Sequence, residues 1–333
     1  MRNFKVLSVF IVIFLLFSVM SYAVENELTI TKKVKIALII PSTIDDMAWS
    51  QVMYEGIKAV QKKYGEEKIE IEVSERLWNA VDAGSAIRQY ASQGFDIVIA
   101  HGAQYQSVLD EVAPDFPKTS FAYGTGFATN HPNIFAYDPQ AQQGSYLLGI
   151  MAGLMTKSNI IGIVGPVKSG DAIKYNIGFE KGVKSVNPEA AVRIAYTGSF
   201  GDLVAAGEIA RTHIKAGADV LSGSAQQCVG AIRVASEFEN VRWLSSDMDQ
   251  SSVAPQTVVA SQSYRFDEVI EKIIGYRQEG ILGGKHLELT LKNGYLEIIV
   301  NPVLASDITP EIEKAVDEAK AKIISGEAKI ELK

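Results

Sequence analysis

The sequence is constrained most strongly by an alternation of short apolar segments with longer amphipathic ones, which runs through the chain twice. In its first course, four short segments rich in β-branched and apolar residues are typical of buried strands: residues 34–40, 69–73, 96–100 and 119–123. Three segments with helical periodicity separate them: residues 48–63, 82–93 and 105–115. Because consecutive parallel strands require a crossover, this alternation predicts an α/β unit whose parallel sheet is covered on both faces.

The second course of the alternation begins near residue 141 and predicts a second unit of the same kind. Its expected strands are residues 160–164, 192–196, 219–222 and 242–244. Its expected helices are residues 141–156, 172–186, 203–215 and 226–238. We therefore expect an α/β protein with two doubly wound parallel-sheet lobes.

The two lobes are expected to be joined by several passages of the chain, because a strand at 257–262 and a helix at 266–279 indicate a return to the first lobe. The passages are expected near residues 137–140, 245–252 and 283–288. Lobe 1 is then residues 34–137 plus about 253–285, and lobe 2 is residues 138–252 plus about 286–333. Ligands of open parallel sheets bind beyond the carboxyl ends of the strands, so the expected site is a central cleft beside the hinge.

The first 23 residues have the features of a signal peptide. Two basic residues, Arg2 and Lys5, precede an apolar stretch at residues 6–20. This stretch is short for a membrane-spanning helix. Small residues precede an expected cleavage after Ala23, and an uncleaved anchor is the alternative. Since the sequence has no cysteine near this point, a lipoprotein anchor is not expected. We expect an exported protein, in the periplasm or at the cell surface.

The composition excludes several classes of protein. Of the 333 residues, 47% are hydrophobic and one is a cysteine, which is incompatible with a disordered chain or a disulfide scaffold. The formal net charge of −7 disfavours a nucleic-acid-binding surface, which needs positive charge against phosphate. We expect no nucleic-acid partner and a monomeric protein.

Sequence patterns of enzymes are mostly missing. A phosphate-loop spacing at residues 165–170 is followed by Asp171 where a lysine is required, and a carboxylate repels phosphate. The four histidines are scattered without a zinc motif, and no G-x-S-x-G pattern occurs. Asp247 and Asp249 pair two carboxylates, but their spacing does not establish glycosidase geometry. We therefore expect a binding protein without cofactor or metal rather than an enzyme.

Aromatic and short polar residues occur together at the ends of expected strands. Trp49 lies with Asp46 and Ser50 at the start of the first helix, and Phe200 lies in a comparable loop of the second lobe. Two aromatic rings on opposite lobes can enclose a flat heteroaromatic ligand. Carboxylates such as Asp46 and Asp247 can accept hydrogen bonds from its N–H groups. The alternatives are core or loop packing for the aromatic residues, and helix capping or hinge hydrogen bonds for the carboxylates.

Several short motifs occur along the chain: residues 46–56, Gln143-Gly-Ser-Tyr-Leu-Leu-Gly149, Gly178-Phe-Glu-Lys-Gly182, Tyr196-Thr-Gly-Ser-Phe200, Ala216-Gly-Ala-Asp219 and Asp247-Met-Asp-Gln250. Together they resemble the basic membrane protein (BMP, or Med) family of ABC-importer substrate-binding proteins, which includes purine nucleoside receptors. The resemblance runs from about residue 34 to residue 324. It implies the fold of a type I periplasmic binding protein, with a hinge and a central cleft, and an ABC permease in the membrane as partner.

The resemblance also implies roles for individual residues. Trp49 corresponds to the first-lobe aromatic residue that stacks on the purine, and Phe200 corresponds to its second-lobe partner. Asp46 matches the family aspartate three residues before the first aromatic residue. Asp247 matches the acidic residue that nucleoside-binding members use at the ribose. The full set of candidate ligand-binding residues is Asp46, Trp49, Ser50, Tyr123, Phe200, Gly223, Asp247 and Tyr264.

Two departures from the family pattern bear on the ligand. Trp49 and Ser50 stand where the nucleoside receptors have phenylalanine and asparagine. Tyr264 replaces a lysine that contacts the ribose in those receptors, three residues after a serine kept as Ser261. We therefore expect a purine-type ligand in the cleft, with a free nucleobase such as adenine favoured over a nucleoside. The alternatives are a sugar-type solute receptor, or a sensory binding module that partners a signalling protein.

Overall fold

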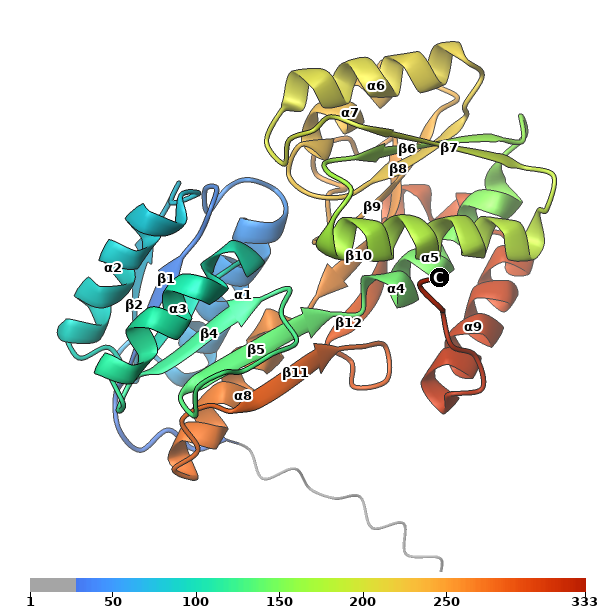
Figure 1. Ribbon diagram of the computed structural model, residues 1–333. Helices are drawn as coiled ribbons and strands as arrows, with labels where there is room; N and C mark the ends of the chain where they lie inside the picture. The colour runs from blue at the N-terminus through green and yellow to red at the C-terminus, as the bar shows by residue number, and fades with distance from the viewer. Residues whose placement is uncertain (1–27) are drawn as a thin grey trace, which may run out of the picture.

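The computed structural model describes residues 28–333, so the expected signal peptide at residues 1–23 lies outside the described part of the chain. Figure 1 shows two α/β lobes, one at the lower left and one at the upper right, each built on a sheet of six strands. The expectation of two parallel-sheet α/β lobes is therefore confirmed.

The first sheet combines the first five strands of the chain with a late one, and every neighbouring pair is parallel. In spatial order its strands are β11 (Lys285–Leu289), β5 (Ile134–Pro139), β4 (Ser120–Gly124), β3 (Ile97–Ala100), β1 (Val34–Ile39) and β2 (Ile69–Ser74). The helices of this lobe are α1 (Trp49–Tyr64), α2 (Ala80–Ser92), α3 (Gln106–Val112) and α8 (Phe266–Gln278), with short 3-10 turns η1 (Ala103–Tyr105) and η2 (Ala113–Asp115).

Strand β1 shows why the sheet is covered on both faces. Ile36 and Leu38 belong to the apolar cluster that includes α1 and α8, whereas Ala37 and Ile39 belong to the cluster that includes α2 and α3. Successive side chains of a strand point to opposite faces, so the part of β1 that lies between the two helical layers, residues 36–39, is apolar at every position.

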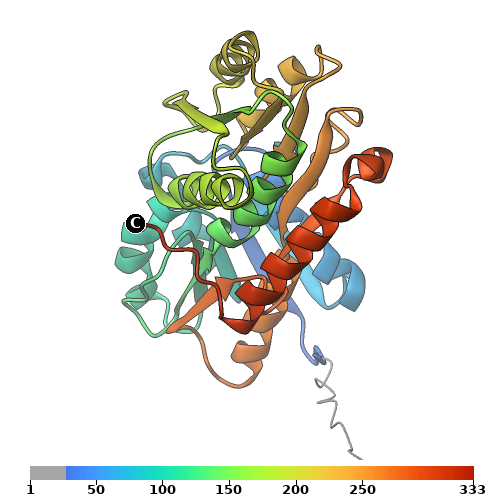
Figure 2. The same cartoon turned by 90° about the vertical axis from the view of Figure 1, so that its right-hand side faces the viewer.

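The second sheet repeats the order of the first. Its strands are β12 (Leu296–Val300), β10 (Val258–Tyr264), β9 (Arg242–Ser245), β8 (Val220–Gly223), β6 (Ile160–Gly165) and β7 (Ala191–Tyr196). Only the pair of β12 with β10 is antiparallel. The helices of this lobe are α4 (Ala141–Met155), α5 (Gly170–Val186), α6 (Leu203–Lys215), α7 (Cys228–Ala235) and α9 (Pro310–Ser325), with a 3-10 segment η3 (Pro302–Asp307). Helix α9, the red helix at the front of Figure 2, packs on α4.

The chain passes between the sheets after β5, after β10 and after β11. Two expected passages are therefore wrong. The strand expected at 257–262 does not return to the first lobe, because β10 pairs with β9 and β12. The passage expected near residues 283–288 lies a few residues too early, since these residues overlap β11 of the first sheet and the chain passes to the second sheet after β11, so lobe 2 does not resume at residue 286. The range of about 253–285 predicted for lobe 1 consequently begins too early: the return starts with α8.

The wrong assignment of β10 has a physical cause. All seven residues of β10 are buried, as in a central strand, so no side of the strand is marked as facing solvent and its pattern fits either sheet. Strand β5 is missed for a similar reason: six buried residues lie directly before the first passage, where the pattern predicts only a connection.

Helices α4 and α5 pack closely because glycines lie at their contact. A Cβ atom on Gly182 would lie 2.1 Å from the carbonyl oxygen of Tyr146, and one on Gly149 would lie 2.1 Å from that of Phe179. Both distances are far below van der Waals contact, so these two glycines of the sequence motifs have a packing role.

Replacing Gly182 by alanine should reduce the free energy of unfolding by about 1–3 kcal/mol or more, because the new methyl group meets backbone that cannot move aside. The expected result is a fall of several degrees in Tm by calorimetry. Gly275→Ala in α8 is the matched control, since its Cβ would have its nearest neighbour at 3.9 Å. Its Tm should stay the same or rise, because alanine favours a helix over glycine. Equal Tm values for the two variants would contradict this packing account.

Candidate ligand-binding site

A cavity of about 290 Å³ lies between the lobes, at the carboxyl ends of strands from both sheets. Its lining includes residues that follow β1, β3 and β4 of the first lobe and β6, β8 and β9 of the second: Pro41, His101, Thr125, Pro166, Ser224 and Asp247. Parallel strands place all these residues on facing edges. Of the candidate residues, the cavity brings together Trp49, Phe200, Asp247 and Tyr264.

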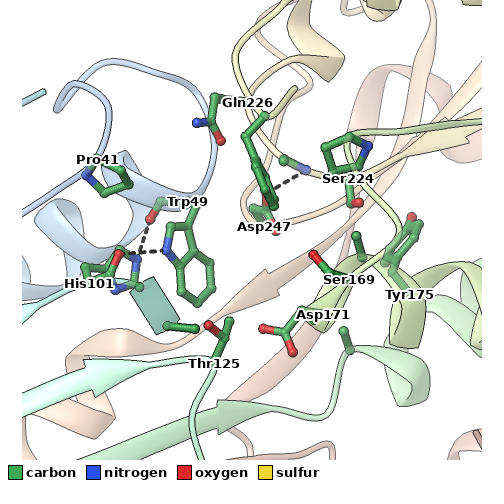
Figure 3. A pocket seen from close by; sticks show the side chains of 18 of the residues that line it. Pro41, Trp49, His101, Thr125, Ser169, Asp171, Tyr175, Ser224, Gln226 and Asp247 are labelled. Carbon is green, nitrogen blue, oxygen red and sulfur yellow. Dashed lines mark hydrogen bonds between the residues drawn. The ribbon is translucent and has the colours of Figure 1, made fainter. Parts of the chain in front are cut away.

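Trp49, the first residue of α1, forms one wall of the cavity (Figure 3). Its indole stacks on the ring of His101, with centroids 4.1 Å apart and planes 12° apart. Its Nε1–H donates to the His101 carbonyl oxygen at 3.2 Å. Phe266 and Tyr264 pack nearly at right angles to the indole, with centroid distances of 5.5 and 6.1 Å. These contacts hold Trp49 as a rigid aromatic surface.

His101 supports Trp49 without adding a charge. The residue is fully buried, and burial lowers the pKa of its imidazole to about 3. Nε2 lies 2.8 Å from the Trp49 carbonyl oxygen, which can only accept, so Nε2 carries the proton of the neutral ring. Nδ1 then accepts from the Tyr137 hydroxyl at 2.6 Å. The sequence pattern does not single out His101 as a ligand-site residue; its place directly after β3 is the one signal for it.

Phe200 lines the cavity from the loop after β7, and its ring neighbour is Trp78 rather than Trp49. The centroids of Phe200 and Trp78 are 5.5 Å apart with planes at 45°. Trp78 follows β2 of the first lobe and is 52% exposed, so this pair joins the lobes at the solvent side of the cavity.

Asp247 supplies a buried carboxylate. The residue is 7% exposed and has a φ of 71°, a left-handed conformation that aspartate and asparagine tolerate better than most residues. Its Oδ2 accepts a hydrogen bond from the Ala225 N–H at 3.2 Å. Burial raises the pKa of Asp247 to about 7, and the charge of Asp46 adds to the rise.

Asp171 is a second buried carboxylate that lines the cavity and that the candidate set lacks. It lies in the first turn of α5. Burial raises its pKa to about 7, although Lys174 at 3.0 Å opposes this. The sequence signal was present, because Asp171 follows the phosphate-loop spacing in place of lysine.

The other four candidates lie outside the cavity lining. The carboxylate of Asp46 accepts the N–H groups of Ala48, Ser50 and Gln51, and so caps α1. Ser50 is fully buried within the first turn of α1. The Tyr123 hydroxyl donates to the Ala128 carbonyl oxygen at 2.5 Å. Gly223 ends β8, where a Cβ would lie 2.4 Å from the Val164 carbonyl oxygen. A ligand contact by any of these residues stays a prediction.

Tyr264 lines the cavity, and its hydroxyl accepts a hydrogen bond from the Gln262 side chain at 2.8 Å. The adjacent Arg265 does not replace the missing lysine, because its guanidinium pairs with Asp267 at 2.7 Å and Glu268 at 3.0 Å. Within residues 28–333 no group of three or more His, Cys, Asp or Glu side chains could hold a metal ion. No helix in that part of the chain is long and apolar enough to cross a membrane.

The sequence was compared with known protein families and with known proteins. Residues 33–330 match the model of the Bmp family, described as PnrA-like ABC transporter substrate-binding proteins. Basic membrane protein A of Borreliella burgdorferi is 27% identical over 300 residues, which cover 88% of this chain and 86% of that protein. A purine-binding protein of Brucella abortus is 24% identical over 299 residues, which cover 89% and 82% of the two chains.

A solved structure of an ABC transporter solute-binding protein from Aeropyrum pernix superposes with a TM-score of 0.78 at 21% identity, covering 89% of this chain and 92% of that chain. This likeness shows the fold, that of a type I periplasmic binding protein.

Replacing Asp247 by asparagine should change how stability depends on pH. A carboxyl group whose pKa is raised from 3.8 to about 7 in the folded state stabilises the protein below pH 4 and loses that contribution as the pH rises through 7. Asparagine has no charge to bury, so the Tm of the ligand-free variant relative to the unmodified protein should be higher at pH 8 than at pH 5. A difference in Tm that is the same at both pH values would contradict the raised pKa.

Proposed function

The chain belongs to the Bmp family of PnrA-like ABC transporter substrate-binding proteins, and we propose that within this family it is an exported receptor for a purine-type ligand. The ligand is a free nucleobase in preference to a nucleoside. It binds between aromatic side chains of the two lobes and is delivered unchanged to an ABC permease in the membrane.

The observation that carries this proposal is the aromatic surface of Trp49 in the interlobe cavity. One face of the indole is fixed by His101 and its edge is packed by Phe266, so the ring is ordered before any ligand arrives. Phe200, from the other lobe, lines the same cavity. A flat heteroaromatic ring can stack on such surfaces, and each stacking contact contributes about 1–3 kcal/mol.

The size and polarity of the cavity support a base rather than a nucleoside. At about 290 Å³ the cavity lies at the lower end of the range of ligand pockets. Tyr264 stands where a cationic donor to the ribose would be needed, and Arg265 is occupied by Asp267 and Glu268. Ribose hydroxyl groups would therefore lack a charge-assisted donor. The name of the Brucella abortus relative is consistent with a purine.

The arrangement of the lobes supports transport by hinge closure. Each lobe contributes part of the cavity, so a ligand makes all of its contacts only when the lobes meet, and binding favours the closed form. The expected signal peptide at residues 1–23 brings the receptor out of the cytoplasm, and we propose that it acts there as a monomer.

Calorimetric titration with adenine, guanine, adenosine and guanosine tests the proposal. At least one purine should bind with a Kd well below about 100 μM, and the base should bind more tightly than its nucleoside. Absence of binding by every purine at this level would refute the purine proposal, and a tighter nucleoside would refute the preference for the base.

Replacing Trp49 by alanine should weaken binding of the preferred purine by roughly 10- to 100-fold, because a stacking surface is lost. Trp49→Phe is the matched control: it keeps an aromatic face and should retain most of the affinity. Melting curves of both variants show whether each is folded before titration. An alanine variant that is folded and binds as well as the unmodified protein would remove Trp49 from the ligand site.

A further inference from the structure

The side chain of Asp171 is directed into the cavity, and its carboxylate can accept further hydrogen bonds there. Figure 3 shows its carboxylate pointing from the second lobe toward Thr125 of the first. Both carboxylate oxygens are shielded from solvent, and among the described residues Oδ2 has no hydrogen-bond donor. One oxygen lies 3.0 Å from the Lys174 ammonium group, an ion pair along α5. A buried carboxylate left in this state is costly unless something donates to it.

Ser224 is a second, independent sign that the cavity holds a polar ligand. This residue is 7% exposed and lines the same cavity, yet its Oγ has no hydrogen-bond partner within the described residues. Native proteins rarely leave buried polar groups unpaired, so unpaired groups around one cavity point to a polar ligand there.

The charges around the cavity decide which ligands fit. Among residues 28–333, Asp171 and Asp247 are the acidic residues that line it, and no lysine or arginine of that part of the chain does so. His101 is neutral, because burial lowers its pKa to about 3. Carboxylates accept hydrogen bonds but repel anions, so this lining favours N–H donors and disfavours phosphate and carboxylate groups.

We propose that Asp171 is a specificity-determining residue of the cleft and that it selects an aminopurine over an oxopurine by accepting a hydrogen bond from the exocyclic amino group. The inference rests on the proposed function and names its substrate class more closely. Adenine presents an amino group where hypoxanthine presents a carbonyl oxygen. Above the raised pKa of Asp171, about 7, that oxygen would face an ionised carboxylate, which has no proton to share.

The ion pair with Lys174 holds Asp171 in this position. Lys174 Nζ also donates to Asp138 Oδ1 at 2.6 Å, and Asp138 belongs to β5 of the first sheet, beside the first passage between the lobes. The cation therefore lies between two carboxylates, one that lines the cavity and one that does not. This arrangement supplies a control that separates ligand recognition from the ion pair.

The test is a calorimetric comparison of adenine and hypoxanthine at pH 8.5, where Asp171 with a pKa of about 7 is ionised. The unmodified protein should bind adenine at least about tenfold more tightly than hypoxanthine. In Asp171→Asn the side-chain amide can donate to a carbonyl oxygen as well as accept, so the adenine-to-hypoxanthine ratio should fall by about tenfold or more. Asp138→Asn removes a carboxylate from the same lysine outside the cavity, and its ratio should stay within about twofold of the original.

Each other outcome overturns the inference. A protein that binds hypoxanthine as tightly as adenine contradicts it without any variant, even if Asp171→Asn fails to fold. A folded Asp171→Asn with an unchanged ratio shows that Asp171 does not read the base. An equal change in Asp138→Asn shows that the ion pair, and not recognition, is responsible. In these cases purine binding itself still stands, whereas a protein that binds no purine refutes the proposed function as well.

Discussion

Every feature of the candidate site depends on the direction of the strands. Parallel strands present all their carboxyl ends at one edge of a sheet, and three passages of the chain hold the two sheets so that these edges face each other. Residues that are far apart in the sequence, such as His101, Asp171 and Asp247, thereby line one cavity. The hinge and the binding site consequently have the same origin, since the connections that join the lobes also set the distance between the two edges.

Within this frame the site combines a fixed aromatic wall with unsatisfied polar groups. Trp49 is immobilised by His101, which is kept neutral by burial and hydrogen-bonded at both ring nitrogens. Asp171 and Asp247, in contrast, are buried acids with raised pKa values, a state that destabilises the empty protein at neutral pH. In the account proposed above, a ligand that donates hydrogen bonds relieves this cost, and its binding then favours the closed form.

Much of the fold could be predicted from the sequence, because strand and helix periodicities are local and the doubly wound pattern follows from them. The parts that could not be predicted are those that depend on partners. Strand β10 is buried on both faces and fits either sheet by its pattern, so its membership is decided by pairing with β9 and β12. The candidate site divides in the same way into residues that local sequence indicates and residues that it does not. Residue type and motif predict Trp49 and Phe200. The structure shows that His101 and Asp171 also line the cavity, which depends on three-dimensional packing. Asp46 is the opposite case: the motif predicts a ligand-binding residue, whereas its contacts in the structure are those of a residue that caps helix α1.

The central claim is that this cleft holds a purine base. The most direct test is to identify the small molecule that the protein carries when it is isolated from the cell. The protein is purified from its own host without added ligand, denatured, and the released small molecules are identified by mass spectrometry against a mock purification. A purine base, adenine above all, released in an amount comparable to the protein is the predicted result. Stoichiometric release of a sugar or another compound without a purine ring would contradict the account.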